Sequence, residues 1–76
     1  MKKDPPVIFR ENSEKFKKSV DTCNYLLYDL DYTHSIEDLD FLEKIDEFMG
    51  TYKRIDDRQM IKLLHIYSKL RSKGIT

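Results

Sequence analysis

The sequence is poor in the residues on which small extracellular and metal-binding domains depend. It has one cysteine, two histidines, two glycines, two prolines and no tryptophan among 76 residues. Cys23 has no partner for a disulfide within the chain, so nothing indicates an oxidising compartment. His34, His65 and Cys23 are separated by gaps that match no zinc-site spacing. We therefore expect no metal and no cofactor.

Long apolar runs are also absent. No stretch approaches the roughly 20 apolar residues of a membrane-spanning helix, and the N-terminus lacks the apolar segment of a signal peptide. Gly50 and Gly74 cannot make a glycine-rich phosphate loop. The carboxylates fall on polar helical faces, away from any apolar pocket that would raise a pKa. The sequence therefore predicts a non-enzymatic, cytoplasmic protein without membrane contact.

Apolar residues recur at helical spacing in three segments. We predict helices over residues 13–31, 35–49 and 56–73. The last two are joined by a short link and should form an antiparallel hairpin. The fold class predicted is all-α, a small three-helix bundle over residues 13–76 preceded by an extended arm over residues 1–12.

Capping residues mark the helix ends. Ser35 suits the start of the second helix, and Asp56 with Gln59 forms a capping box at the start of the third. Glycine is favoured just past a helix end because it adopts the left-handed conformation without strain. Gly50 is therefore predicted to end the second helix and Gly74 the third.

Each predicted helix has one apolar face. On the first it consists of Phe16, Val20, Cys23, Leu27 and Leu30. On the second it consists of Phe41, Leu42, Ile45, Phe48 and Met49. On the third it consists of Met60, Leu63, Leu64, Tyr67 and Leu70, with Ile66 at the edge. These faces are the predicted core.

The N-terminal arm contains an apolar triplet, Val7-Ile8-Phe9, directly after Pro5 and Pro6. The prolines favour an extended path and exclude a helix there. Two interpretations remain open. The triplet folds back over the helices, or it docks on a partner as an added strand.

Three tyrosines fall on the side of the first helix that faces away from its predicted core. Tyr25, Tyr28 and Tyr32 are three and four residues apart, so a helix brings their rings together. Either the arm covers these rings or a partner covers them. The partner is then a foreign protein or a second copy of this chain in a homodimer. Tyrosine is enriched at the energetic centres of interfaces.

Charge is unevenly distributed although the formal net charge is zero. Residues 28–50 carry eight acidic residues and one lysine, a net charge of −7, whereas residues 51–76 carry seven basic and two acidic residues, a net charge of +5. An acidic surface with tyrosines suits a partner with a basic groove, such as a protein that handles nucleic acid. The predicted protein-binding residues are Tyr25, Tyr28, Tyr32, Asp29, Asp40, Glu43 and Glu47.

The third helix offers an alternative site. Its polar side carries five basic residues, Arg58, Lys62, His65, Lys69 and Lys73. Regularly spaced cations on one helix follow the phosphates of nucleic acid, which would make the protein a direct DNA- or RNA-binding protein.

Residues 41–70 contain three consecutive motifs that together suggest a family. They are Phe41-Leu42-x-x-Ile45-x-x-Phe48, then Ile55-Asp56-Asp57-Arg58-Gln59, then Leu63-Leu64-x-Ile66-x-x-x-Leu70. This stretch resembles a two-helix hairpin of phage and bacterial DNA-handling accessory proteins. The resemblance implies a phage, viral or replication-repair setting, in the host cytoplasm if the chain is phage-encoded, and it brings no catalytic residue. We therefore predict a regulatory accessory protein or inhibitor that acts by protein–protein interaction.

Overall fold

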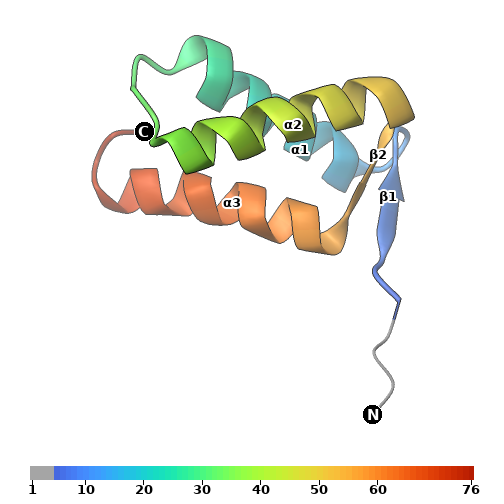
Figure 1. Cartoon of the computed structure of the whole chain (residues 1–76). Coiled ribbons are helices and arrows are strands. Elements are labelled where there is room, and N and C mark those ends of the chain that lie inside the picture. Colours follow the sequence, from blue (N-terminus) through green and yellow to red (C-terminus); the bar gives the residue numbers. More distant parts are fainter. Residues whose placement is uncertain (1–4) are drawn as a thin grey trace.

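The computed structural model describes residues 5–76 and contains three helices that pack together, with a small two-stranded sheet at one end (Figure 1). The elements are β1 (Ile8–Arg10), α1 (Glu14–Asn24), a π-helical turn η1 (Tyr25–Asp29), α2 (Ile36–Tyr52), β2 (Arg54–Asp56) and α3 (Asp57–Ser72). The predicted small, mainly α-helical bundle is confirmed, and α2 and α3 run antiparallel (Figure 1). The first four residues of the predicted arm lie outside the described part. None of the helices within residues 5–76 has both the length and the apolar character needed to span a membrane.

The apolar triplet of the arm folds back on its own chain. β1 pairs antiparallel with β2, and Phe9 lies opposite Ile55. The Asp57 amide also donates to the Val7 carbonyl at 2.9 Å. Ile55 is fully buried and Phe9 packs against the core. The link that precedes α3 is therefore a strand that carries part of the core, and β1 covers it.

The second helix is longer than predicted. It runs through Gly50 to Tyr52, so the prediction that Gly50 ends it is wrong. Lys53 ends it instead, with a left-handed backbone (φ 55°, ψ 41°) and an amide that bonds to the Met49 carbonyl. This conformation is uncommon outside glycine. The predicted left-handed glycine at the end of α3 is confirmed, since Gly74 has a φ of 76°.

The predicted capping box of α3 is confirmed. The backbone N–H of Gln59 donates to Asp56 Oδ1 at 2.7 Å, and the backbone N–H of Asp56 donates to Gln59 Oε1 at 3.0 Å. Ser35 caps α2 by accepting the Asp38 amide at 3.3 Å. These bonds satisfy amides that have no partner inside the helix, so local sequence defines both helix starts.

The first helix buries a face rotated from the predicted one. Val20, Leu27 and Leu30 are only half-buried, whereas Ser19 and Leu26 are fully buried. Ser19 tolerates burial because its hydroxyl donates to the Lys15 carbonyl at 2.7 Å, and its small side chain suits a close contact. The helix also ends at Asp29, earlier than predicted, after its last turn widens into η1.

The core side of α3 is likewise rotated. Leu63, Ile66 and Leu70 are fully buried. Leu64, which was predicted to lie in the core, is exposed. Met60 and Tyr67 are half-buried and pack against the core from one flank.

On α2 the centre of the predicted face is correct and its edge is not. Leu42, Ile45 and Met49 are buried, as predicted. Phe41 and Phe48 are half-buried at the rim of the core.

Cys23 lies in this core and should be chemically inert while the protein is folded. Its side chain is fully buried, Sγ donates to the Leu42 carbonyl at 3.5 Å, and burial together with the nearby Asp46 carboxylate raises its pKa to about 12. The thiolate is the reactive form. We expect no labelling by a thiol reagent in native buffer near pH 8 and full labelling in denaturant, measured by mass spectrometry. Equal labelling rates under the two conditions would contradict this placement.

Candidate protein-binding groove

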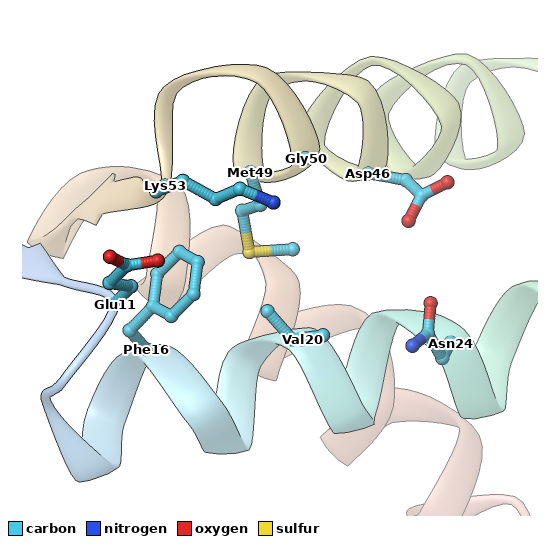
Figure 2. Close-up of a pocket in the computed structure, with 8 residues that line it drawn as sticks. All are labelled: Glu11, Phe16, Val20, Asn24, Asp46, Met49, Gly50 and Lys53. Carbon is cyan, nitrogen blue, oxygen red and sulfur yellow. The ribbon is translucent and has the colours of Figure 1, made fainter.

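A groove of about 320 Å³ lies between α1 and α2 (Figure 2). It is lined by Glu11, Phe16, Val20, Asn24, Asp46, Met49, Gly50 and Lys53. Apolar side chains occupy its middle, Glu11 and Lys53 lie at one end, and Asn24 and Asp46 lie at the other (Figure 2). The groove therefore offers an apolar floor between two polar ends, the arrangement that is common at binding sites.

Gly50 leaves the backbone of α2 open along this groove. It lies inside the helix and is exposed, and a Cβ added there would meet no atom within 4 Å. Glycine inside a helix costs roughly 0.5–1 kcal/mol relative to alanine. Since the fold itself has room for a side chain at this position, the open backbone is available to a ligand that approaches α2 closely.

Tyr28 stands at the acidic end of the groove. Its hydroxyl donates to Asp46 Oδ2 at 2.8 Å, while the residue remains 69% exposed. The hydrogen bond to this carboxylate and its negative charge raise the pKa of Tyr28. The bond joins η1 to α2 and holds an exposed aromatic ring in one position, which lowers the entropic cost of using that ring in a contact.

Acidic side chains extend from this point over the outer face of α2. The predicted residues Asp40, Glu43 and Glu47 are all exposed there, and Asp29 is exposed beside Tyr28 at the end of η1. Asp40 pairs with Lys44 at 3.0 Å. Glu43 and Glu47 face solvent. Asp46, three residues after Glu43, lines the groove, so the acidic stripe borders the groove on α2.

The three tyrosines do not form one surface, and this prediction is wrong. Tyr25 is half-buried, packs edge-on against Tyr67 with the ring centres 6.3 Å apart, and accepts a hydrogen bond from the Thr76 hydroxyl at 2.6 Å. Tyr32 packs against His34 instead. Tyr32 lies beyond the end of η1 at Asp29, and the wider turn of η1 shifts Tyr28 from the position it would have in a regular α-helix.

The arm does not cover the tyrosines either. β1 lies beside the start of α1, at the opposite end of that helix from η1 (Figure 1). Tyr28 therefore stays exposed to solvent.

The predicted basic face of α3 is exposed but partly engaged within the chain. Lys69 forms an ion pair with Asp38 at 2.9 Å, and this hydrogen bond lowers the pKa of Asp38. The Lys62 ammonium lies 4.7 Å from the centre of the Phe41 ring. Both contacts tie α3 to α2. The other three residues predicted for this face are exposed, namely Arg58, His65 and Lys73.

Sequence reasoning missed the groove residues Asn24, Asp46 and Gly50. Asp46 lies three residues after Glu43 and extends the same acidic stripe, which was the available signal. Within residues 5–76, no group of three His, Cys, Asp or Glu side chains is arranged to hold a metal ion. Protein-family models, curated proteins and solved structures gave no match to the chain.

Proposed function

We propose that this protein is a small accessory or inhibitory protein that binds another protein through the α1–α2 groove and Tyr28. One observation carries the proposal: an exposed tyrosine ring is fixed by Asp46 at the end of an open apolar groove. Interface energy is concentrated in a few anchors, and tyrosine is among the commonest. Such a ring is ready to make contact without first being ordered.

The charges nearby indicate the chemistry of the partner. The net charge of residues 28–50 is −7; Asp46 lines the groove, and the Asp46 and Glu43 carboxylates both act on Tyr28. Opposite charges accelerate association and suppress wrong partners. The partner segment therefore combines basic residues with an apolar residue that enters the groove. Proteins that handle nucleic acid present basic surfaces of this kind.

Occupying such a surface would be enough for a regulatory effect. A chain with an acidic face competes directly with nucleic acid for a basic groove. The resemblance of residues 41–70 to a hairpin of phage and bacterial DNA-handling accessory proteins supports the same setting. The alternative, direct binding of nucleic acid by α3, is less supported because Lys62 and Lys69 already contact α2.

The test uses a partner captured from host lysate by the tagged protein after nuclease treatment, then purified. We expect Tyr28→Ala to weaken its affinity by about 2 kcal/mol, roughly 30-fold, in a calorimetric titration. The thermal melt should change little, because the Tyr28–Asp46 bond is exposed. Ile61→Ala is the matched control, because it truncates an exposed side chain on α3 that does not line the groove, and it should bind like the wild type.

Gly50→Ala separates binding from folding in the same assay. The substitution should stabilise the fold by about 0.5–1 kcal/mol, because alanine is the better helix residue and meets no obstacle. It should nevertheless weaken binding, since its methyl group enters the groove. Unchanged affinity in both Tyr28→Ala and Gly50→Ala would reject the groove as the interface. Capture that is lost after nuclease treatment would favour direct nucleic-acid binding instead.

A further inference from the structure

Two arginines face each other on the outer side of the small sheet. Arg10 lies directly opposite Arg54. The Asp57 amide bonds to the Val7 carbonyl, and hydrogen-bonded pairs alternate along an antiparallel ladder. Counting from the hydrogen-bonded pair of Val7 and Asp57, every second pair is hydrogen-bonded, and the pair of Arg10 and Arg54 is one of those between. In such pairs the opposite side chains lie closest.

This arginine pair has no counter-ion among residues 5–76. Among residues 5–76, ion pairs are formed by Lys44 with Asp40 and by Lys69 with Asp38, and neither pair includes Arg10 or Arg54. Like charges directly opposite each other weaken strand pairing. An anion bound between the two guanidinium groups would remove this repulsion.

Aromatic rings hold one of the two guanidinium groups in place. The Arg54 guanidinium carbon lies 5.5 Å from the centre of the Tyr52 ring and 5.8 Å from that of Phe48. The two rings contact each other with their centres 4.8 Å apart. Arginine binds over aromatic rings through cation–π attraction and stacking. The left-handed Lys53 turns the chain back so that Arg54 reaches these rings.

A hollow of about 230 Å³ adjoins the same rings. It is lined by Lys44, Glu47, Phe48, Thr51 and Tyr52. Tyr52 is 58% exposed, so one side of its ring is open to solvent. The cluster thus offers two cations next to an exposed aromatic surface.

We propose that Arg10 and Arg54 bind the phosphate of a phosphomonoester whose organic group lies against Tyr52. The planar guanidinium matches phosphate with paired hydrogen bonds, and a phosphomonoester carries close to two negative charges near pH 7. Two arginines balance that charge. A terminal phosphate carries this double charge, whereas each phosphate within a nucleic-acid strand carries one, so the arginine pair favours the terminal phosphate.

This site is separate from the α1–α2 groove. It uses the outer side of the sheet and the flank of α2 that carries Phe48 and Tyr52, whereas the groove lies on the flank that carries Asp46. Its failure would leave the proposed protein-binding function untouched.

The test is an NMR titration of the full chain with phenyl phosphate, observing the arginine Nε–Hε signals. We expect the Arg10 and Arg54 signals to shift, and Arg10→Gln or Arg54→Gln to weaken binding by more than about tenfold. Arg71→Gln, which removes an exposed arginine from the last turn of α3, is the matched control and should bind as the wild type does.

Two further readouts separate a phosphate site from general attraction between charges. Affinity should rise between about pH 5 and pH 7, as the phosphate loses its second proton near pH 6. Phenyl sulfate, which has no second proton, should bind more weakly and without this pH dependence. Arg54→Lys keeps the charge but loses the planar fork, so it should fold normally and bind weakly.

Stability and binding should move in different directions. Arg10→Gln removes the repulsion across the sheet, so its thermal midpoint should be no lower than that of the wild type.

Parallel titrations with a nucleoside 5′-monophosphate and with O-phosphotyrosine identify the source of the phosphate, and tighter binding of either supports the site. The proposal is overturned if the Arg10 and Arg54 signals do not shift at about 10 mM phenyl phosphate, a range that detects even millimolar affinity. It is also overturned if Arg71→Gln weakens binding as much, or if an oligonucleotide without a terminal phosphate binds equally well.

Discussion

Leu63→Ala should remove a large fraction of the protein's stability, whereas Leu64→Ala, one residue further on, should remove little. Leu63 is 0% exposed and Leu64 is 41% exposed. Truncating a buried leucine costs about 2–5 kcal/mol, through lost apolar burial and the cavity that remains. A chain of this length has a total stability of about 4–11 kcal/mol. The Leu63 variant therefore loses a large fraction of it.

The two variants form a matched pair, because they remove the same atoms from adjacent positions of one helix. Urea unfolding followed by circular dichroism gives both free energies. We expect less than about 1 kcal/mol for Leu64→Ala, since its side chain is already partly in water. Equal unfolding midpoints for the two variants would show that α3 is rotated from the orientation described.

His34→Ala should be the most destabilising substitution in the connection between η1 and α2. His34 is buried, and its Nε2 lies 2.8 Å from the Leu26 carbonyl. A carbonyl only accepts, so Nε2 carries the proton and donates. Without this donor, the Leu26 carbonyl in η1 is left buried without the partner that His34 supplies, which costs about 1–3 kcal/mol. The lost imidazole volume adds to that cost.

The neighbouring Thr33→Ala provides the control, because Thr33 is exposed in the same connection. We expect about 2–4 kcal/mol for His34→Ala and less than about 0.5 kcal/mol for Thr33→Ala, from the same urea measurements. Cys23 labelling should also become faster in the His34 variant, since η1 covers part of the core. Indistinguishable stabilities for the two variants would mean that His34 does not secure η1.

The helices and their starts were predictable because their signals are local. The Asp56–Gln59 capping box and the Ser35 cap need only a few adjacent residues. The exact residues of each helix that face the core were not predictable from the sequence. Leu64 and Ile66 both lie near the apolar face of α3, and only the packing of α3 against the rest of the chain buries Ile66 and leaves Leu64 exposed.

The strands and the end of α2 depended on contacts that sequence patterns do not reveal. β1 and β2 have three residues each and lie far apart in the sequence, too short for a recognisable alternation. Gly50 was a reasonable stop signal. The chain instead ends α2 at Lys53, whose strained backbone is held by the sheet that follows.

For the candidate site, the sequence indicated Tyr28 and the acidic stripe but not the groove. The acidic positions follow from helical periodicity along α2 alone. The groove requires knowledge of how α1 packs on α2, and the hydrogen bond of Tyr28 to Asp46 requires the widened turn of η1. Distances between helices are set by packing, so periodicity within one helix cannot supply them.

The pairing of β1 with β2 also determines when the chain is able to fold during its synthesis. Chains emerge from the ribosome N-terminus first. Residues 8–10 therefore appear long before residues 54–56, and closing so long a loop is entropically costly until other contacts reward it. Leu70, near the end of α3, is also part of the core. β1 consequently stays without its partner strand until residues 54–56 have been made, so the sheet and the core it covers form late.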